Sequence, residues 1–257
     1  MTGIDREVCA RVEGLTVDIT ARRRWDRIAV RVLDDVDLEL SAGSVTALVG
    51  ESGCGKSMIA AALTGLLPAG SRMTGSVVVD DRALTIDDPC WSTMRGRRIG
   101  LVPQSPSTSF TPVRTVGSQL DEVVRRLAGS RSAAELCRDV SLPVASLDLY
   151  PHELSGGMAQ RVAIAAALAG DPAIVVADEP TSALDRELAA DIWELLAVTA
   201  GDGAAVLAIT HDIDTLTDGR CDTIAVMRAG AIVAQGPIHE MLVSPDPYVA
   251  EFFEPVS

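Results

Sequence analysis

The chain has 257 residues, a formal net charge of −14 and 47% hydrophobic residues, which allows one large domain or one domain with an insert. The acidic balance argues against non-specific binding to nucleic acid, and no apolar run reaches the roughly 18 residues of a membrane-spanning helix. The polar first residues lack the apolar stretch of a signal peptide, so we expect an intracellular protein.

The first third of the chain predicts strands followed by a helix. Residues 8–20 and 28–40 alternate apolar and polar side chains, which is typical of half-exposed antiparallel strands. Residues 45–49 are short, apolar and rich in β-branched side chains, which indicates a buried strand. Residues 56–67 are rich in Ala, Leu and Met and predict a helix.

Between this buried strand and helix lies the segment GESGCGKS, residues 50–57. It fits the spacing of a phosphate-binding loop, in which backbone N–H groups and a helix N-terminus converge on phosphates. Lys56 is the only lysine among the 22 Lys and Arg residues, and a compact point charge suits the β- and γ-phosphates of a nucleotide. The predicted nucleotide-binding residues of the loop are Gly50, Glu51, Ser52, Gly53, Cys54, Gly55, Lys56 and Ser57.

Two residues of this loop carry further expectations. Ser57 offers a hydroxyl ligand for Mg²⁺. Cys54 stands beside a helix N-terminus and Lys56, which should favour its thiolate; of the two interpretations we nevertheless favour an inert small residue that the loop tolerates. The five cysteines are scattered without any C-x-x-C pair, which argues against a structural zinc or iron–sulfur site.

The second half of the chain alternates helices and apolar strands. Residues 105–155 read as a mostly helical insert, and residues 158–169 form a strong helix. Strands are expected at 173–177 and 204–210, with a helix at about 186–200 between them. This order predicts an α/β fold with a parallel sheet that is covered on both faces.

Two carboxylates follow the strand at 173–177. Asp178 could hold Mg²⁺ through water, and Glu179 could polarise an attacking water. Such a pair is common by itself, but a phosphate loop in the same chain makes nucleotide hydrolysis the favoured interpretation.

The segment LSGGMAQR, residues 154–161, forms a second helix start with anion-binding character. Ser155 supplies a hydroxyl, and Gly156 and Gly157 leave backbone N–H groups accessible. Because only one loop carries a lysine, we expect this second site to contact a nucleotide held by another subunit. The alternative is an ordinary N-cap with flexible glycines.

Together these motifs resemble the ATPase domains of ABC transporters. The set stands in that family's order along the chain: GESGCGKS, Gln104, LSGGMAQR, VVADEP (175–180), SALD (182–185) and THD (210–212). The resemblance implies a P-loop NTPase with a RecA-like parallel-sheet core, an antiparallel β subdomain and a helical insert. The implied layout is one domain, 1–257, with a core at about 1–104 and 156–257 and a helical subdomain at about 105–155.

The resemblance also implies roles for individual residues, with ATP and Mg²⁺ as the bound species. Glu179 is similar to the general base, His211 to the residue that contacts the γ-phosphate, and Gln104 to the lid glutamine that senses metal and water. Ser57, Gln104 and Asp178 correspond to the metal sphere. Ser155, Gly156, Gly157 and Asp185 correspond to the groups that contact the partner's ATP and communicate across the dimer. Trp25 is the only candidate for stacking on adenine.

Finer segments resemble the ATPases of dipeptide, oligopeptide and nickel importers, namely residues 103–120, 149–161 and 236–248. This resemblance implies two membrane permease subunits, a second ATPase subunit that is identical or related, an extracytoplasmic solute-binding protein and no nucleic acid. It places the chain peripherally on the cytoplasmic face of the plasma membrane. An exporter ATPase and a soluble, non-transport ABC ATPase are the alternatives, and the cargo stays open between peptides and nickel or metal chelates.

Overall fold

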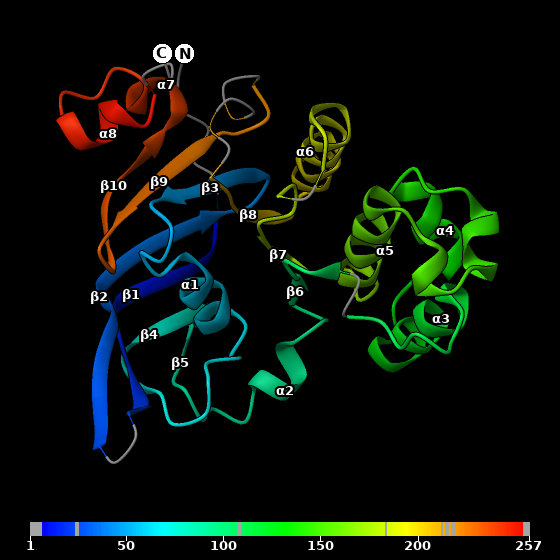
Figure 1. Cartoon of the computed structure of the whole chain (residues 1–257), viewed down its shortest axis with the longest axis horizontal. Coiled ribbons are helices and arrows are strands. Elements are labelled where there is room, and N and C mark those ends of the chain that lie inside the picture. The colour runs from blue at the N-terminus through cyan, green and yellow to red at the C-terminus, as the bar shows by residue number, and fades with distance from the viewer. Residues whose placement is uncertain are drawn as a thin grey trace.

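The computed structural model of the protein describes residues 7–23, 26–106, 109–182, 184–211, 213, 216 and 219–253. Figure 1 shows two sheets stacked toward one side of the molecule and a helical lobe at the opposite side. None of the described helices is long and apolar enough to cross a membrane.

The central sheet has six strands in the order β10-β9-β3-β8-β7-β6. All neighbouring pairs from β9 to β6 are parallel, and β10 runs antiparallel at one edge. The strands are β3 (Ser44–Gly50), β6 (Ile99–Val102), β7 (Ile174–Asp178), β8 (Ala205–Ile209), β9 (Thr223–Arg228) and β10 (Ala231–Pro237).

The second sheet is antiparallel, with four strands in the order β2-β1-β4-β5. Its strands are β1 (Val8–Arg23), β2 (Asp26–Ser41), β4 (Arg72–Val79) and β5 (Arg82–Leu84). The two long strands β1 and β2 confirm the antiparallel pair predicted from the alternating pattern.

The main helices are α1 (Lys56–Leu63), α3 (Val116–Leu127), α4 (Ala133–Asp139), α5 (Gly156–Leu168) and α6 (Arg186–Gly201). Five short helices, of which η2 and η3 are 3₁₀ helices, follow: α2 (Trp91–Met94), η2 (Val144–Asp148), η3 (Pro151–Glu153), α7 (Ile238–Met241) and α8 (Pro247–Glu251). In Figure 1, α3 and α4 lie at the far end of the lobe, with α5 on the side nearer the sheet.

Apolar side chains fill both faces of the central sheet. Along β7, Val175 belongs to the cluster that includes α5 and α6, whereas Val176 belongs to the cluster that includes α1 and the antiparallel sheet. This alternation is the period-2 geometry of a strand. The prediction of a parallel sheet covered on both faces, with an antiparallel subdomain and a helical insert, is confirmed; the residue boundaries of the subdomains stay a prediction.

The predicted helix 56–67 is too long, because α1 ends at Leu63. Gly65 adopts a left-handed φ of +63°, and the N–H of Leu66 donates to the carbonyl of Ala61 at 2.7 Å. This is a glycine-terminated helix end that satisfies the last carbonyls. Helical composition alone did not reveal where the turn begins.

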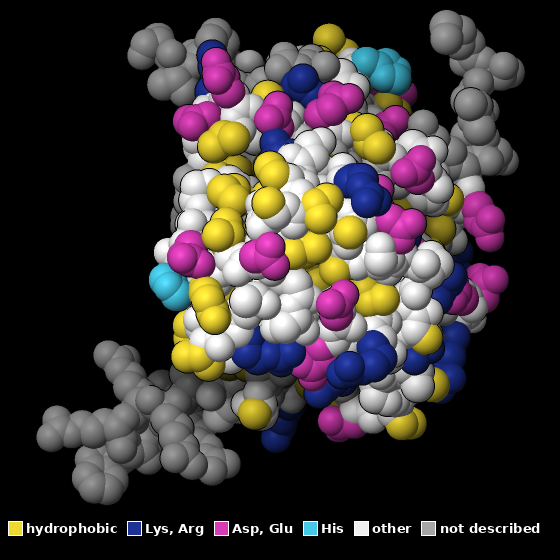
Figure 2. Space-filling view, turned by 90° about the vertical axis from the view of Figure 1, so that its right-hand side faces the viewer, with side chains coloured by type: hydrophobic (Ala, Val, Ile, Leu, Met, Phe, Trp, Pro, Cys, Tyr) yellow, Lys and Arg dark blue, Asp and Glu magenta, His cyan; other side chains and the backbone are white. Residues whose placement is uncertain are grey.

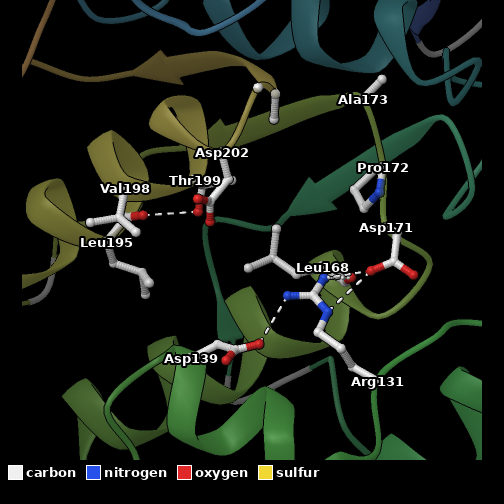
Figure 3. Close-up of a pocket in the computed structure, with 12 residues that line it drawn as sticks. Arg131, Asp139, Leu168, Asp171, Pro172, Ala173, Leu195, Val198, Thr199 and Asp202 are labelled. Atoms are coloured by element: carbon white, nitrogen blue, oxygen red, sulfur yellow. Dashed lines mark hydrogen bonds and ion pairs between the residues drawn. The ribbon is translucent and has the colours of Figure 1, made fainter.

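The helical lobe is joined to the core by an arginine at the start of α4. Figure 3 shows Arg131 between Asp139 of α4 and Asp171 of the turn before β7. Its guanidinium also donates to the carbonyl of Leu168 at 2.7 Å. The pocket around it, about 540 Å³, includes Ala173 and Ala204, so it lies where β7 and β8 begin, at the end of the sheet opposite Asp178.

Candidate nucleotide site

The phosphate loop joins the C-terminal end of β3 to the N-terminus of α1. Gly55 precedes the helix with a φ of +112°, and no side chain caps the helix N-terminus. A β-carbon at Gly55 would lie 2.9 Å from the carbonyl oxygen of Val32. The turn therefore needs glycine, and it leaves the first N–H groups of α1 without a protein side-chain acceptor.

The start of the loop is also sterically tight. A β-carbon at Gly50 would lie 2.4 Å from the carbonyl oxygen of Met227 on β9. The loop backbone can therefore follow β9 closely only with glycine at this position. Glu51, Ser52, Gly53 and Ser57 are exposed, whereas Cys54 and Lys56 are buried.

Lys56 is held by the loop that it serves. Its Nζ donates to the carbonyls of Gly50 at 2.8 Å and Glu51 at 2.9 Å, and only 7% of the residue is exposed. An ammonium group beside uncapped helix N–H groups is a donor set that fits phosphate. The predicted role of this loop therefore agrees with its geometry.

Two of the predicted metal ligands lie side by side. The Ser57 hydroxyl donates to Oδ1 of Asp178 at 3.1 Å. Burial raises the pKa of Asp178, while the Ser57 hydrogen bond and the charge of Lys56 oppose that rise. Two hard oxygen donors next to a phosphate site fit Mg²⁺, which takes few protein ligands and completes its shell with phosphate and water oxygens.

The three predicted catalytic residues meet at the end of β7. Nε2 of Gln104 donates to Oε2 of Glu179 at 2.8 Å, and Nδ1 of His211 lies 3.8 Å from Oε1 of Glu179. Glu179 itself has a φ of +47°, and its N–H donates to the carbonyl of Ile209 at the end of β8. This uncommon backbone conformation turns the carboxylate toward the two partners.

The remaining predicted residues lie at two helix starts. The N–H of Met158 donates to Oγ of Ser155 at the start of α5, and the N–H of Leu188 donates to Oδ1 of Asp185 at the start of α6. A β-carbon at Gly157 would lie 3.1 Å from Leu188, so the two helix starts pack together. Within the described residues, no hydrogen bond joins Ser155, Gly157 or Asp185 to Lys56 or Ser57.

The thiolate that the sequence neighbours of Cys54 suggest is disfavoured in the structure, in line with the preferred interpretation of an inert residue. Burial is the largest influence on this thiol and raises its pKa, although the charge of Lys56 acts in the opposite direction. Only 8% of the residue is exposed. Desolvation of the charged form outweighs the neighbouring cation here, which sequence position could not reveal.

Sequence reasoning missed one aromatic residue at this site. Oη of Tyr248, from α8, donates to the carbonyl of Met227 at 3.3 Å, and this carbonyl is the one that contacts Gly50. The Arg228 guanidinium lies 4.5 Å from the centre of the Tyr248 ring. Burial, followed by the charge of Glu51, raises the Tyr248 pKa. Tyr248 ends the segment 236–248 that resembles the importer ATPases, but nothing in the sequence placed it beside the phosphate loop.

Trp25, the candidate for adenine stacking, lies outside the described residues.

Comparison with known proteins agrees with this geometry. The ABC transporter family model matches residues 33–182. A probable peptide ABC transporter ATP-binding protein of Sinorhizobium fredii is 39% identical over 241 residues, covering 89% of this chain and 71% of the relative. The oligopeptide transport ATP-binding protein OppD of Lactococcus lactis subsp. cremoris is 37% identical, covering 84% of this chain and 67% of the relative.

Solved structures show the same fold. The ATP-binding cassette MJ0796, in a dimeric post-hydrolysis state with ADP and Pi bound, superposes with a TM-score of 0.75 at 28% identity, covering 89% of this chain and 98% of that one. A nucleotide-free cassette from an ABC transporter gives a TM-score of 0.77 at 24% identity, covering 97% of this chain and all of that one.

The fold and the site together define a P-loop ATPase. The chain belongs to the ABC transporter family, as an ATP-binding and ATP-hydrolysing cassette. ATP is its nucleotide, and Mg²⁺ is the ion that accompanies it.

Proposed function

We propose that this chain is the ATP-hydrolysing subunit of a peptide importer. The observation that carries the catalytic part is the pairing of Ser57 with Asp178 directly beside the contacts of Gln104 and His211 with Glu179. The relatives reported above are named for peptide and oligopeptide transport, which favours peptides over nickel as the cargo. The likeness to a solved bacterial Atm1-family exporter is weaker, at 26% identity, and no observation favours a soluble, non-transport ABC ATPase.

Lys56 and the N–H groups at the start of α1 bind the phosphates in this proposal. Ser57 and Asp178 would hold Mg²⁺, which supplies neutralisation of charge on the phosphate oxygens. Lys56 is already oriented, because its ammonium group lies among loop carbonyls within the loop. Binding exchanges these carbonyl contacts for phosphate contacts without requiring a new backbone fold.

Glu179 acts as the general base in this proposal. Its carboxylate accepts the proton of a water that attacks the γ-phosphate, which is the usual task of such a group in ATP hydrolysis. Gln104 reaches one carboxylate oxygen and His211 approaches the other, so both orient the base. The carboxylate is largely shielded, since 21% of the Glu179 side chain is exposed, against 62% of the His211 side chain.

A second cassette completes the site. Ser155, Gly157 and Asp185 lie at two packed helix starts and form no hydrogen bond with the phosphate loop of their own chain within the described residues. We assign them to the nucleotide held by the partner cassette. Each ATP would then lie between one phosphate loop and the other subunit's residues 154–161.

The permease would dock beside the lid segment. A pocket of about 480 Å³ lies between β6 and the helices α3 and α5, and its lining is mainly apolar: Leu101, Pro103, Phe110, Val123, Leu127 and Ala163 are among its residues. Figure 2 looks onto the side of the molecule that carries the helical lobe and shows apolar side chains gathered across its middle. We propose that a cytoplasmic helix of a permease occupies this pocket, which places the chain on the cytoplasmic face of the membrane.

Phe110→Asp tests the docking proposal. A charge in the apolar pocket should abolish peptide uptake by the assembled transporter. ATP binding should be retained, because Phe110 lines this pocket and not the one that holds Gln104 and Glu179. Val243→Asp is the control, since Val243 is 79% exposed and lies outside the pocket. Normal uptake by the Phe110→Asp transporter would contradict the docking site. Loss of uptake together with loss of ATP binding would indicate misfolding, and a Phe110→Ser variant with measured thermal stability then decides the question.

A further inference from the structure

A small pocket separates the helix start at 155 from the catalytic carboxylate. It has a volume of about 180 Å³. The lid segment lines it with Gln104, the helix α5 lines it with Gly156 and Gln160, and the turn after β7 lines it with Glu179 and Ser182. This pocket therefore touches the proposed catalytic pair from the side of α5.

Gln160 carries a buried amide that is not hydrogen-bonded. The residue is 4% exposed, and its Nε2 has no hydrogen-bond partner. Burying a donor without an acceptor is unfavourable, so buried amides are usually satisfied. Gln119 shows the usual arrangement in the same protein: it is 8% exposed, and its Nε2 donates to the carbonyls of Thr111 and Arg114.

An acceptor faces the same pocket. Gln104 uses its Nε2 to donate to Glu179 at 2.8 Å, which leaves the amide oxygen Oε1 as its remaining polar atom. Within the described part of the chain, no hydrogen bond reaches this oxygen. Gln104 and Gln160 thus line one pocket with complementary groups: the Gln160 donor is buried and unpaired, and the acceptor oxygen belongs to Gln104, which is exposed.

We propose that Gln160 is a positioning residue for the pair formed by Gln104 and Glu179. In this proposal the Gln160 amide donates a hydrogen bond to Oε1 of Gln104 across the pocket that both residues line during ATP hydrolysis. This bond fixes the orientation of the Gln104 amide, so that its N–H stays on the Glu179 carboxylate. The inference rests on the catalytic roles given to Gln104 and Glu179 under the proposed function.

The position of Gln160 on α5 would link two parts of the site. Gln160 lies on α5, the helix that begins at Ser155. A contact from α5 to Gln104 would join the helix start that meets the partner's nucleotide to the base that acts on the chain's own nucleotide. Hydrogen bonds in series polarise one another, so a bond from Gln160 would reinforce the bond from Gln104 to Glu179.

Gln160→Met separates this role from simple packing. Methionine is similar in length and removes the unsatisfied donor, so a packing residue should tolerate it with an unchanged or higher Tm. If Gln160 positions the pair, kcat for ATP hydrolysis by the full-length chain falls about tenfold, the effect of one lost hydrogen bond in the transition state, while KM for ATP stays within twofold. Gln119→Met is the stability control and should lower Tm, because it removes satisfied hydrogen bonds.

A double-mutant cycle tests whether Gln160 acts through Gln104. In a Gln104→Ala background, Gln160→Met should have no further effect on kcat. An unchanged kcat for the Gln160→Met single variant would overturn the proposal. The proposal would also fail if Gln160→Met lowered kcat by the same factor in the wild type and in the Gln104→Ala background. Glu179→Gln, assayed in parallel, distinguishes two causes of an unchanged kcat in Gln160→Met. If Glu179→Gln also leaves kcat unchanged, the catalytic assignment of Glu179 fails. If Glu179→Gln loses activity, the catalytic assignment stands and the role of Gln160 alone is refuted.

Discussion

At the scale of single residues, Lys56 is the feature on which the nucleotide site depends. It is the only lysine of the chain, and the structure buries it among the carbonyls of its own loop. The sequence predicted its role from spacing and from its uniqueness. The sequence could not predict that the residue is shielded, because shielding depends on how β9 and the turn after it pack against the loop.

This shielding makes a prediction about chemical labelling. An amine-reactive reagent should modify Lys56 slowly in the free protein, with the N-terminal amine of the same molecule as the internal reference, and Mg-ATP should block the reaction. Peptide mapping by mass spectrometry measures both rates. Equal labelling of Lys56 with and without Mg-ATP would contradict the phosphate-loop assignment.

Cys54 shows the limit of reasoning from neighbours in sequence. A cation and a helix N-terminus lie beside it, yet burial decides the direction of its pKa shift. Similarly, Gln104, Glu179 and His211 were each predicted separately, but their meeting depends on the order of β6, β7 and β8 in the sheet. Tertiary placement supplied the contacts in both cases.

At the scale of elements, the strands and long helices were largely predictable because their apolar periodicity is strong. Short elements were not: β5, α2, α7 and α8 have only three to five residues each, too few for a period to be recognised. The position of Tyr248 on the β9 residues next to the phosphate loop was missed for this reason, since α8 was not expected.

The attachment of the helical lobe also depends on a contact between elements. Asp171 accepts hydrogen bonds from the backbone and hydroxyl of Ser130 and from Arg131. Burial opposes its ionised form, but these donors together hold its pKa below the ordinary value of 3.8. A carboxyl group with a lowered pKa stabilises the folded state at pH values above its ordinary pKa. This contribution is lost as the pH falls through the lower folded-state pKa.

Asp171→Asn should therefore reduce stability at neutral pH. Because 42% of the Asp171 side chain is exposed, solvent screens these contacts, and we expect a loss of about 0.5–1 kcal/mol and a Tm lower by about 1–4 °C. The difference from the wild type should narrow as the pH falls below the ordinary carboxyl pKa of 3.8, because the unfolded wild-type chain then takes up a proton that folded Asp171 still resists. Asp139→Asn is the control and should have a smaller effect, since Asp139 meets only Arg131 in this cluster. A Tm difference that does not change between pH 7 and pH 3 would refute the electrostatic explanation.

At the scale of the whole molecule, the proposed nucleotide site requires two cassettes. The phosphate loop and residues 154–161 each begin a different helix, and the described residues show no hydrogen bond between the two sites. A solved relative in the dimeric, ADP-bound state shows that such cassettes pair. The apolar periodicity of the chain could not predict which surface of the cassette pairs with a second copy. The sequence signal for pairing was the second anion-binding helix start, at residues 154–161.

Ser155→Arg tests the pairing. The isolated chain should bind ATP with unchanged affinity, because Lys56 and Ser57 are untouched. ATP-driven association and hydrolysis should be lost, since a bulky side chain would occupy the position of the partner's nucleotide. Ser132→Arg makes the same change at the N-cap of α4, and it should keep ATP-driven association. Light scattering with and without ATP measures association; weaker ATP binding by the isolated Ser155→Arg chain would show that the residue serves its own chain's nucleotide.

The central claim is that this chain hydrolyses ATP with Glu179 as the base, and Glu179→Gln tests it most directly. Glutamine keeps the shape and an acceptor for Gln104 but cannot take a proton from water. Steady-state hydrolysis should fall at least about 10²-fold, while equilibrium binding of Mg-ATP is retained. Turnover equal to that of the wild type, with the substitution verified by mass, would contradict the claim.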